Sequence, residues 1–134
     1  MNDLTAIFGA PIDVYTRALA LRDGVLVAVP EEAQRKAKLS YPVAVTAAVH
    51  AECVSWESED AEARGAMEEG RLAELLWMAH NAILRAAGGR RVGFEFGYVR
   101  ADDPEAEKSA RLVVACGPDD DGEPVLTVMF PHED

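Results

Sequence analysis

The chain is poor in the residues that build metal centres and disulfide frameworks. Its 134 residues include two cysteines, Cys53 and Cys116, without a CxxC spacing, and three histidines. His50 and Cys53 share one expected helix, but a structural zinc site needs four ligands, usually from paired motifs. The sequence therefore predicts no metal site and no cofactor. Reduced, buried thiols are the favoured state of the cysteines, with a Cys53–Cys116 disulfide as the alternative.

The chain also lacks long apolar runs and an excess of positive charge. No segment approaches the roughly 20 apolar residues that span a bilayer, and the N-terminus has no basic region typical of a secretory signal. A cytoplasmic, membrane-free protein is expected. Lys and Arg number 13 against 24 Asp and Glu, which gives a formal net charge of −11. Such a surface repels phosphate backbones, so no direct nucleic-acid binding is expected. The charge either only solubilises the protein or attracts a basic protein partner.

Motifs for nucleophilic catalysis and phosphate binding are missing as well. Ser55, Ser58 and Ser109 have none of the surroundings of a nucleophile elbow. Gly88-Gly89 follows a predicted helix, and the dipole at that end disfavours an anion. A Cys53–His50 thiolate–imidazole pair is disfavoured because Cys53 lies on an apolar stripe. The sequence favours a protein that is not an enzyme.

Acidic residues gather in two predicted loops. An aspartate-rich turn resembles a calcium loop, but the EF-hand register places Gly117 and Val128 where oxygen-bearing side chains are required. A solvated turn is the better interpretation. The two loops form a candidate acidic interaction surface that comprises Asp102, Asp103, Asp119, Asp120, Asp121 and Glu123.

A long central helix from about Met67 to Ala87 is the clearest predicted element. Leu72, Leu75, Leu76, Ala79 and Ile83 recur at helical spacing and draw one apolar stripe. Polar residues that include Arg71 fall largely off this stripe and are expected on a solvated face. The preceding charged segment, 57–66, is expected to be an exposed loop or a frayed entry to the helix.

Shorter elements precede this helix. An N-terminal segment, 1–14, is expected to dock on the core through Leu4, Ile7 and Phe8, and Thr16 is expected to cap a short helix. Residues 25–29 predict a strand buried on both faces, and Pro30 begins a short surface helix. A second amphipathic helix is expected from about Pro42 or Thr46 to Trp56.

After the central helix the pattern alternates with period two. Residues 92–98 predict a strand with an aromatic face and a glycine-spaced face that carries Glu95. An acidic loop, 101–110, is followed by two further strands, 111–116 and 124–130. The whole chain, 1–134, is therefore predicted to be one α+β domain, in which an antiparallel meander packs against the central helix.

Four residues are candidates for a pocket or an interface: Trp56, Trp77, Glu95 and Tyr98. Trp56 ends the apolar repeat of the second amphipathic helix, and Trp77 flanks the stripe of the central helix. For Trp77 a core or interface role is more common than cofactor stacking. Gly93 and Gly97 leave room beside Glu95 for a ligand or another chain, although such glycines more often mark a strand bend or bulge.

Four segments together resemble a bacterial family of small proteins of unknown function, often encoded on plasmids and integrative conjugative elements. They are LTAIFGAPIDVYTRALALRDGVLVAV, YPVAVTAAVHAECVSW, GRLAELLWMA and VVACGPDDDGEPVLTVMFPHED. The resemblance implies an accessory gene of mobile DNA and transfers no functional residue.

The expected function is a non-enzymatic accessory or interaction protein that binds a protein partner, with a regulatory or anti-defence role. The alternative is a small-molecule-binding or catalytic domain with a pocket between sheet and helices. Homodimerisation through the sheet edge or the Trp77 face is compatible with both.

Overall fold

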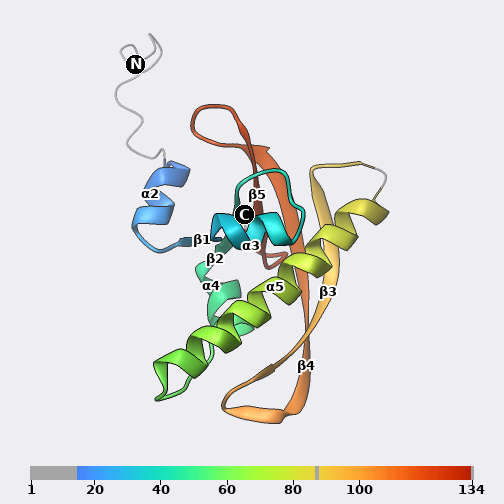
Figure 1. Cartoon of the computed structure of the whole chain (residues 1–134). Coiled ribbons are helices and arrows are strands. Elements are labelled where there is room, and N and C mark those ends of the chain that lie inside the picture. Colours follow the sequence, from blue (N-terminus) through green and yellow to red (C-terminus); the bar gives the residue numbers. More distant parts are fainter. Residues whose placement is uncertain (1–14, 87, 134) are drawn as a thin grey trace.

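The computed structural model describes residues 15–86 and 88–133, so the predicted docking of segment 1–14 lies outside the described residues. One long helix, α5 (Ala61–Arg85), crosses a five-stranded sheet (Figure 1). The predicted α+β class is confirmed.

The sheet is mixed and has the strand order β1-β2-β5-β4-β3. Strands β3 (Arg91–Arg100), β4 (Asp103–Pro118) and β5 (Pro124–Met129) form the predicted antiparallel meander. Strand β2 (Val43–Thr46) pairs with β5 in parallel, and β1 (Leu26–Ala28) pairs with β2 in the antiparallel sense. Through this parallel pair, the strands β1 and β2 and the C-terminal meander form one sheet.

Helix α5 begins at Ala61, six residues before the predicted start at Met67. The Asp60 carboxylate accepts the backbone N–H groups of Glu62 and Ala63, which would otherwise lack partners at the helix start. Residues 61–66 of the predicted charged segment are therefore the first part of the helix, and residues 57–60 precede it.

Two short helices follow the predictions. In α2 (Arg17–Arg22) the Thr16 hydroxyl accepts the N–H of Leu19, as expected of an N-cap. Helix α3 (Glu31–Lys36) begins after Pro30 and places acidic residues in its first turn and basic residues in its last. This distribution favours the helix dipole.

The amphipathic helix predicted from about Pro42 or Thr46 to Trp56 is confirmed only from the later start, because Thr46 caps the helical segment and Pro42 lies outside it. Val43–Thr46 forms β2, and only then do α4 (Ala47–Val49) and a short π-helix, η1 (His50–Val54), follow. All four β2 residues are buried because the strand is paired on both sides, which apolar spacing alone does not reveal. Strand β1, predicted to be buried on both faces, is instead an edge strand with partly exposed residues.

The predicted acidic loop 101–110 is also wrong in extent. Strand β4 begins at Asp103, and residues 108–115 pair with β3 in a long hairpin with a register shift near Tyr98. The charged side chains of this half of β4 are mostly exposed, so the period-two signal has no apolar component there.

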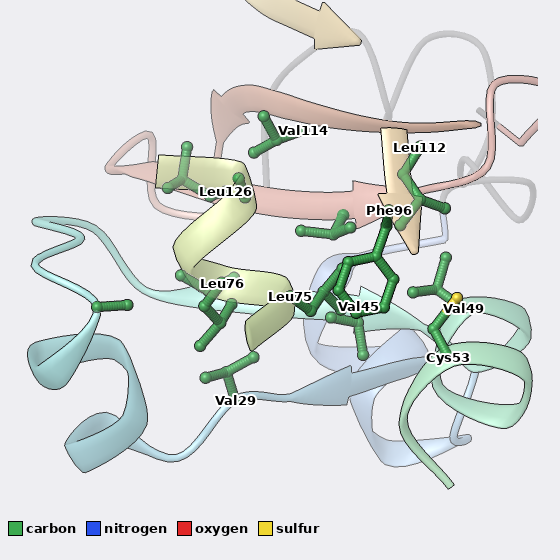
Figure 2. Close-up of a cluster of buried hydrophobic side chains, with 14 of the residues drawn as sticks. Val29, Val45, Val49, Cys53, Leu75, Leu76, Phe96, Leu112, Val114 and Leu126 are labelled. Carbon is green, nitrogen blue, oxygen red and sulfur yellow. The ribbon is translucent and has the colours of Figure 1, made fainter. Parts of the chain in front are cut away.

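The core lies between α5 and one face of the sheet. Figure 2 shows Leu75 of α5, Val45 of β2 and Phe96 of β3 converging, with Val49 and Cys53 beside them. Phe94 and Phe96 are buried, as the predicted aromatic face requires. The sheet's other face carries Glu95 and Thr127, and α2 lies against it, since the Arg17 guanidinium donates to Thr127 Oγ1 at 2.7 Å.

Candidate functional site

Helix α5 has a second apolar stripe on the side away from the core. Its residues recur with alternating spacings of four and three, the spacing of a coiled-coil seam. Most of them are exposed, and Trp77 and Leu84 expose 53% and 68% of their surface. We call this set the outer stripe: Ala66, Gly70, Ala73, Trp77, His80 and Leu84.

A groove of about 790 Å³ runs beside the first half of the outer stripe. One wall is α5 at Ala66, Gly70, Ala73 and Trp77, where three small residues leave the helix backbone close to the open space. The opposite wall consists of β1 and α3, and buried valines that include Val54 form part of its lining. An added Cβ at Gly70 would meet no atom within 4 Å, so this wall is open to an incoming side chain.

The charged residues that line the groove are predominantly acidic. Glu32 pairs with Lys36 across one helical turn at 3.3 Å, and Glu68 accepts the backbone N–H of Trp56 at 2.9 Å. Glu69 lies on the same wall and is exposed. We call this hollow the acidic groove. It combines apolar walls with a net negative lining, a combination suited to a basic apolar segment.

Arg71 lies on the opposite side of α5 and connects this helix to Val54, which lines the groove. The sequence predicts Arg71 on a solvated face, but its side chain is buried with 7% exposure. Its Nε donates to the Val54 carbonyl at 3.0 Å, and its other nitrogens donate to the carbonyls of Val99 and Glu52. Its guanidinium lies 5.3 Å from the centre of the Trp56 ring. The prediction is wrong because these three carbonyls replace water as acceptors.

The carbonyls of Glu52 and Val54 belong to the π-helix η1. Its wide turn is closed by the Ser55 N–H, which donates to the His50 carbonyl at 2.8 Å, five residues back. The Glu52 carboxylate accepts the Tyr98 hydroxyl at 2.5 Å and the Arg100 guanidinium at 2.9 Å. Burial, and then the hydrogen bond to Glu52, raise the pKa of Tyr98, so its phenol stays protonated.

The four predicted pocket residues do not share one pocket. Trp77 lines the acidic groove, Trp56 lies under Arg71, and Tyr98 bonds Glu52 at the hairpin. Glu95 lies on the other face of the sheet, where it accepts Ser109 Oγ at 2.9 Å and pairs with Arg111 at 3.4 Å. The space left by Gly93 is occupied by the Arg111 guanidinium, 3.0 Å from where a Cβ would lie.

The six predicted acidic surface residues form two separate clusters at opposite ends of β4 (Figure 1). Sixteen residues of strand span about 50 Å. At one end Asp102 pairs with Arg100 at 3.1 Å, and this hydrogen bond lowers the pKa of Asp102. At the other end the Asp120 carboxylate accepts the N–H groups of Arg17 and Ala18 and fixes the start of α2. Asp120 thus has a local structural task.

The residue types that could bind a metal ion are not clustered in the part of the chain that the structure describes. Within residues 15–86 and 88–133 no three His, Cys, Asp or Glu side chains are grouped to hold an ion. Cys53 and Cys116 are free thiols. Burial raises the pKa of Cys53 to about 11, which leaves this thiol protonated and unreactive at neutral pH. His50 Nδ1 lies 3.2 Å from the Ser55 hydroxyl and lines the acidic groove.

Sequence reasoning missed the outer stripe, although the signal is present. The alternation of four and three from Ala66 to Leu84 is readable in the sequence, but small residues obscure it because alanine and glycine also suit any surface helix. The acids of the groove lie on two helices, α3 and α5, that only the fold brings together. The burial of Arg71 has no corresponding signal in the sequence.

Taken together, these features define an α+β domain in which one long helix covers a mixed five-stranded sheet and presents an exposed apolar stripe. No helix among the described residues has both the length and the apolar character needed to cross a lipid bilayer. The entire chain, residues 1–134, matches the sequence profile of a family of unknown function, DUF6573, and the protein belongs to that family. No curated protein and no solved structure matches the chain.

Proposed function

We propose that this protein is a non-enzymatic accessory protein that binds a partner protein through the acidic groove. The partner would supply a basic amphipathic helix. One observation carries the proposal: an apolar groove beside an exposed tryptophan, with predominantly acidic charged residues in its lining.

The outer stripe favours a helical partner. Ala66, Gly70 and Ala73 allow the backbone of a second helix to approach closely, and heptad spacing keeps the contact along the helix length. Trp77 adds the large, rigid apolar surface typical of interface hot spots. An amphipathic helix laid in a groove is a recurring mode of recognition between proteins.

Charge favours a basic partner over a second copy of this chain. Glu69 and Glu74 occupy the positions that flank the outer stripe, where charges select coiled-coil partners. A second copy would oppose these glutamates with its own and would also bring its formal net charge of −11. A basic helix is attracted instead, and electrostatic steering accelerates its association.

The resemblance to proteins of plasmids and integrative conjugative elements supports an accessory role of this kind. In that setting the partner would be a regulator or a component of host defence, and the acidic protein would occupy a basic surface on it. The net charge and the groove support this proposal independently of the resemblance.

The test begins with a display library of random peptides selected on the purified protein. Selected peptides are expected to be apolar at heptad spacing and rich in Lys and Arg. Their affinities are then compared between the wild-type protein and a Glu69→Lys/Glu74→Lys variant. The variant is expected to bind about tenfold more weakly, and raising the salt concentration should narrow the difference.

A Glu105→Lys/Glu107→Lys variant is the matched control, because it makes the same charge change on exposed residues of β4. Its affinity for the selected peptides should stay within twofold of wild type at moderate salt, because neither residue lines the groove and salt screens exposed charges. An equal loss in both variants would assign the binding to net charge and refute the groove. Selected peptides without basic residues would refute the proposed partner chemistry.

A further inference from the structure

A second hollow lies at the other end of α5. It has a volume of about 450 Å³, within the usual range of small-molecule pockets. Its walls are the loop after α3, the last turns of α5 and the neighbouring ends of β3 and β4. Apolar side chains form most of the lining, and Leu39, Val114 and Leu126 are buried beneath it.

The charged groups of this hollow have the opposite sign to those of the chain as a whole. Lys38 and Arg90 are exposed at its lining, and His80 lines it from α5. Among the described residues that line it none is acidic, although the chain has 24 Asp and Glu against 13 Lys and Arg. In the described part of the chain neither Lys38 nor Arg90 has a carboxylate within ion-pair distance. We call this hollow the cationic cavity.

Lys38 occupies a position that ordinarily favours glycine. It follows α3 with a φ of 60°, in the left-handed region that costs energy for a residue with a Cβ. The Leu39 N–H donates to the Gln34 carbonyl at 3.1 Å and the Lys38 N–H to that of Arg35 at 3.0 Å, the bonds of a Schellman motif. These two hydrogen bonds hold the Lys38 backbone in the left-handed conformation, at a position where glycine would be more stable. Strain of this kind gathers at functional sites.

We propose that the cationic cavity binds a small organic anion with an apolar body, such as a fatty or aromatic carboxylate. Lys38 and Arg90 would hold the anionic head, and the Tyr41 hydroxyl is a further donor in the lining. Leu39, Val92 and Leu126 would surround the apolar body. This ligand site is separate from the acidic groove and does not depend on the proposed partner.

The reactivity of the Cys116 thiol provides a measure of ligand binding in the cationic cavity. It lines the cationic cavity and is partly exposed, whereas Cys53 is fully buried and its pKa is raised to about 11. Iodoacetamide should therefore alkylate Cys116 alone in the folded protein. A ligand in the cavity covers the thiol and slows this reaction. Mass spectrometry follows the modification at each cysteine.

The probes are octanoate, octyl phosphate, and octylammonium as the cationic control of equal length. Octanoate or octyl phosphate is expected to slow alkylation of Cys116 at least fivefold at saturation, and the better of the two identifies the head group. Octylammonium should have no effect. If neither anion protects Cys116, or if octylammonium protects it equally, the proposal is wrong.

Substitutions then test the cations. A Lys38→Gln/Arg90→Gln variant should need about tenfold more of the anion for the same protection. An Arg35→Gln/Lys108→Gln variant, which removes two exposed cations outside the lining, should match the wild type. Lys38→Gly should weaken protection while raising the melting temperature, so the loss cannot come from misfolding. Unchanged protection in both Lys38 variants would overturn the assignment.

Discussion

The acidic groove and the cationic cavity lie along the same helix and differ in sign. The end of α3 separates them: Lys36 lines the groove and pairs with Glu32, whereas Lys38 lines the cavity without such a pair. On α5 the division falls between Trp77 and His80, whose rings stack with centroids 6.0 Å apart. The formal net charge of −11 therefore agrees in sign with the groove and not with the cavity.

The largest expected effect comes from a residue that supports the groove from the side of the core. Arg71→Met removes the donor to the carbonyls of Val54, Val99 and Glu52 and leaves buried acceptors without partners. We expect a loss of about 3 kcal/mol in the free energy of unfolding, measured by urea denaturation. Arg71→Lys keeps the charge but not the planar fork, and should lose an intermediate amount. A neutral effect of Arg71→Met would show that the carbonyls find water.

The raised pKa of the buried Cys53 thiol makes the stability of the protein depend on pH. Cys53 has a folded pKa raised from 9.0 to about 11, so the fold favours the neutral thiol. The unfolded state then loses its proton first, and stability should fall as the pH rises between about 9 and about 11, by about 2 kcal/mol. The raised pKa of Tyr98 acts in the same direction at higher pH.

Urea denaturation across this pH range measures the effect. Cys53→Ala should lower the stability at neutral pH but remove most of the slope between about pH 9 and about pH 11. An unchanged slope in this variant would assign the pH dependence to other groups.

A side chain that fills the acidic groove should weaken peptide binding without affecting the cationic cavity. Gly70→Leu places a side chain in open space on the groove wall and raises helix propensity, so the fold should persist. Affinity for the selected basic peptides should fall about tenfold, while anion protection of Cys116 stays unchanged. Gly65→Leu, at the other unobstructed glycine of α5, gains the same propensity outside the groove lining and should leave both unchanged. A loss of anion protection in Gly70→Leu would show that the two hollows are coupled.

The smallest expected effect is a gain in stability at the cavity. Lys38→Gly relieves the left-handed strain and should add about 1 kcal/mol, or about 4 °C in melting temperature. Scanning calorimetry measures it. Lys38→Ala, which removes the charge and keeps the Cβ, is the control and should add nothing. Equal stability of the Gly and Ala variants would show that the strain is negligible.

Much of the fold was predictable because its signals are local. The stripe from Leu72 to Ile83 predicts the core face of α5, and the alternation from Val92 to Tyr98 predicts the core face of β3. Strand β2 was not predictable in this way, since Val43–Thr46 fits a helical spacing and becomes a strand only by pairing with β1 and β5. Likewise, the charged half of β4 is held by β3 and not by its own pattern.

Of the four predicted pocket residues, only Trp77 lies at the candidate site, and the sequence did not predict the groove around it. None of the other three residues, Trp56, Glu95 and Tyr98, lines the groove, and Glu95 lies on the other face of the sheet. The predicted acidic surface is divided between the two ends of β4. The sequence by itself determined the class of fold, the long helix and the excess of negative charge, because composition and periodicity depend on neighbours along the chain. Only the tertiary structure decided where that charge is reversed, because Lys38 and Arg90 lie far apart in the chain and line one hollow only in the folded protein.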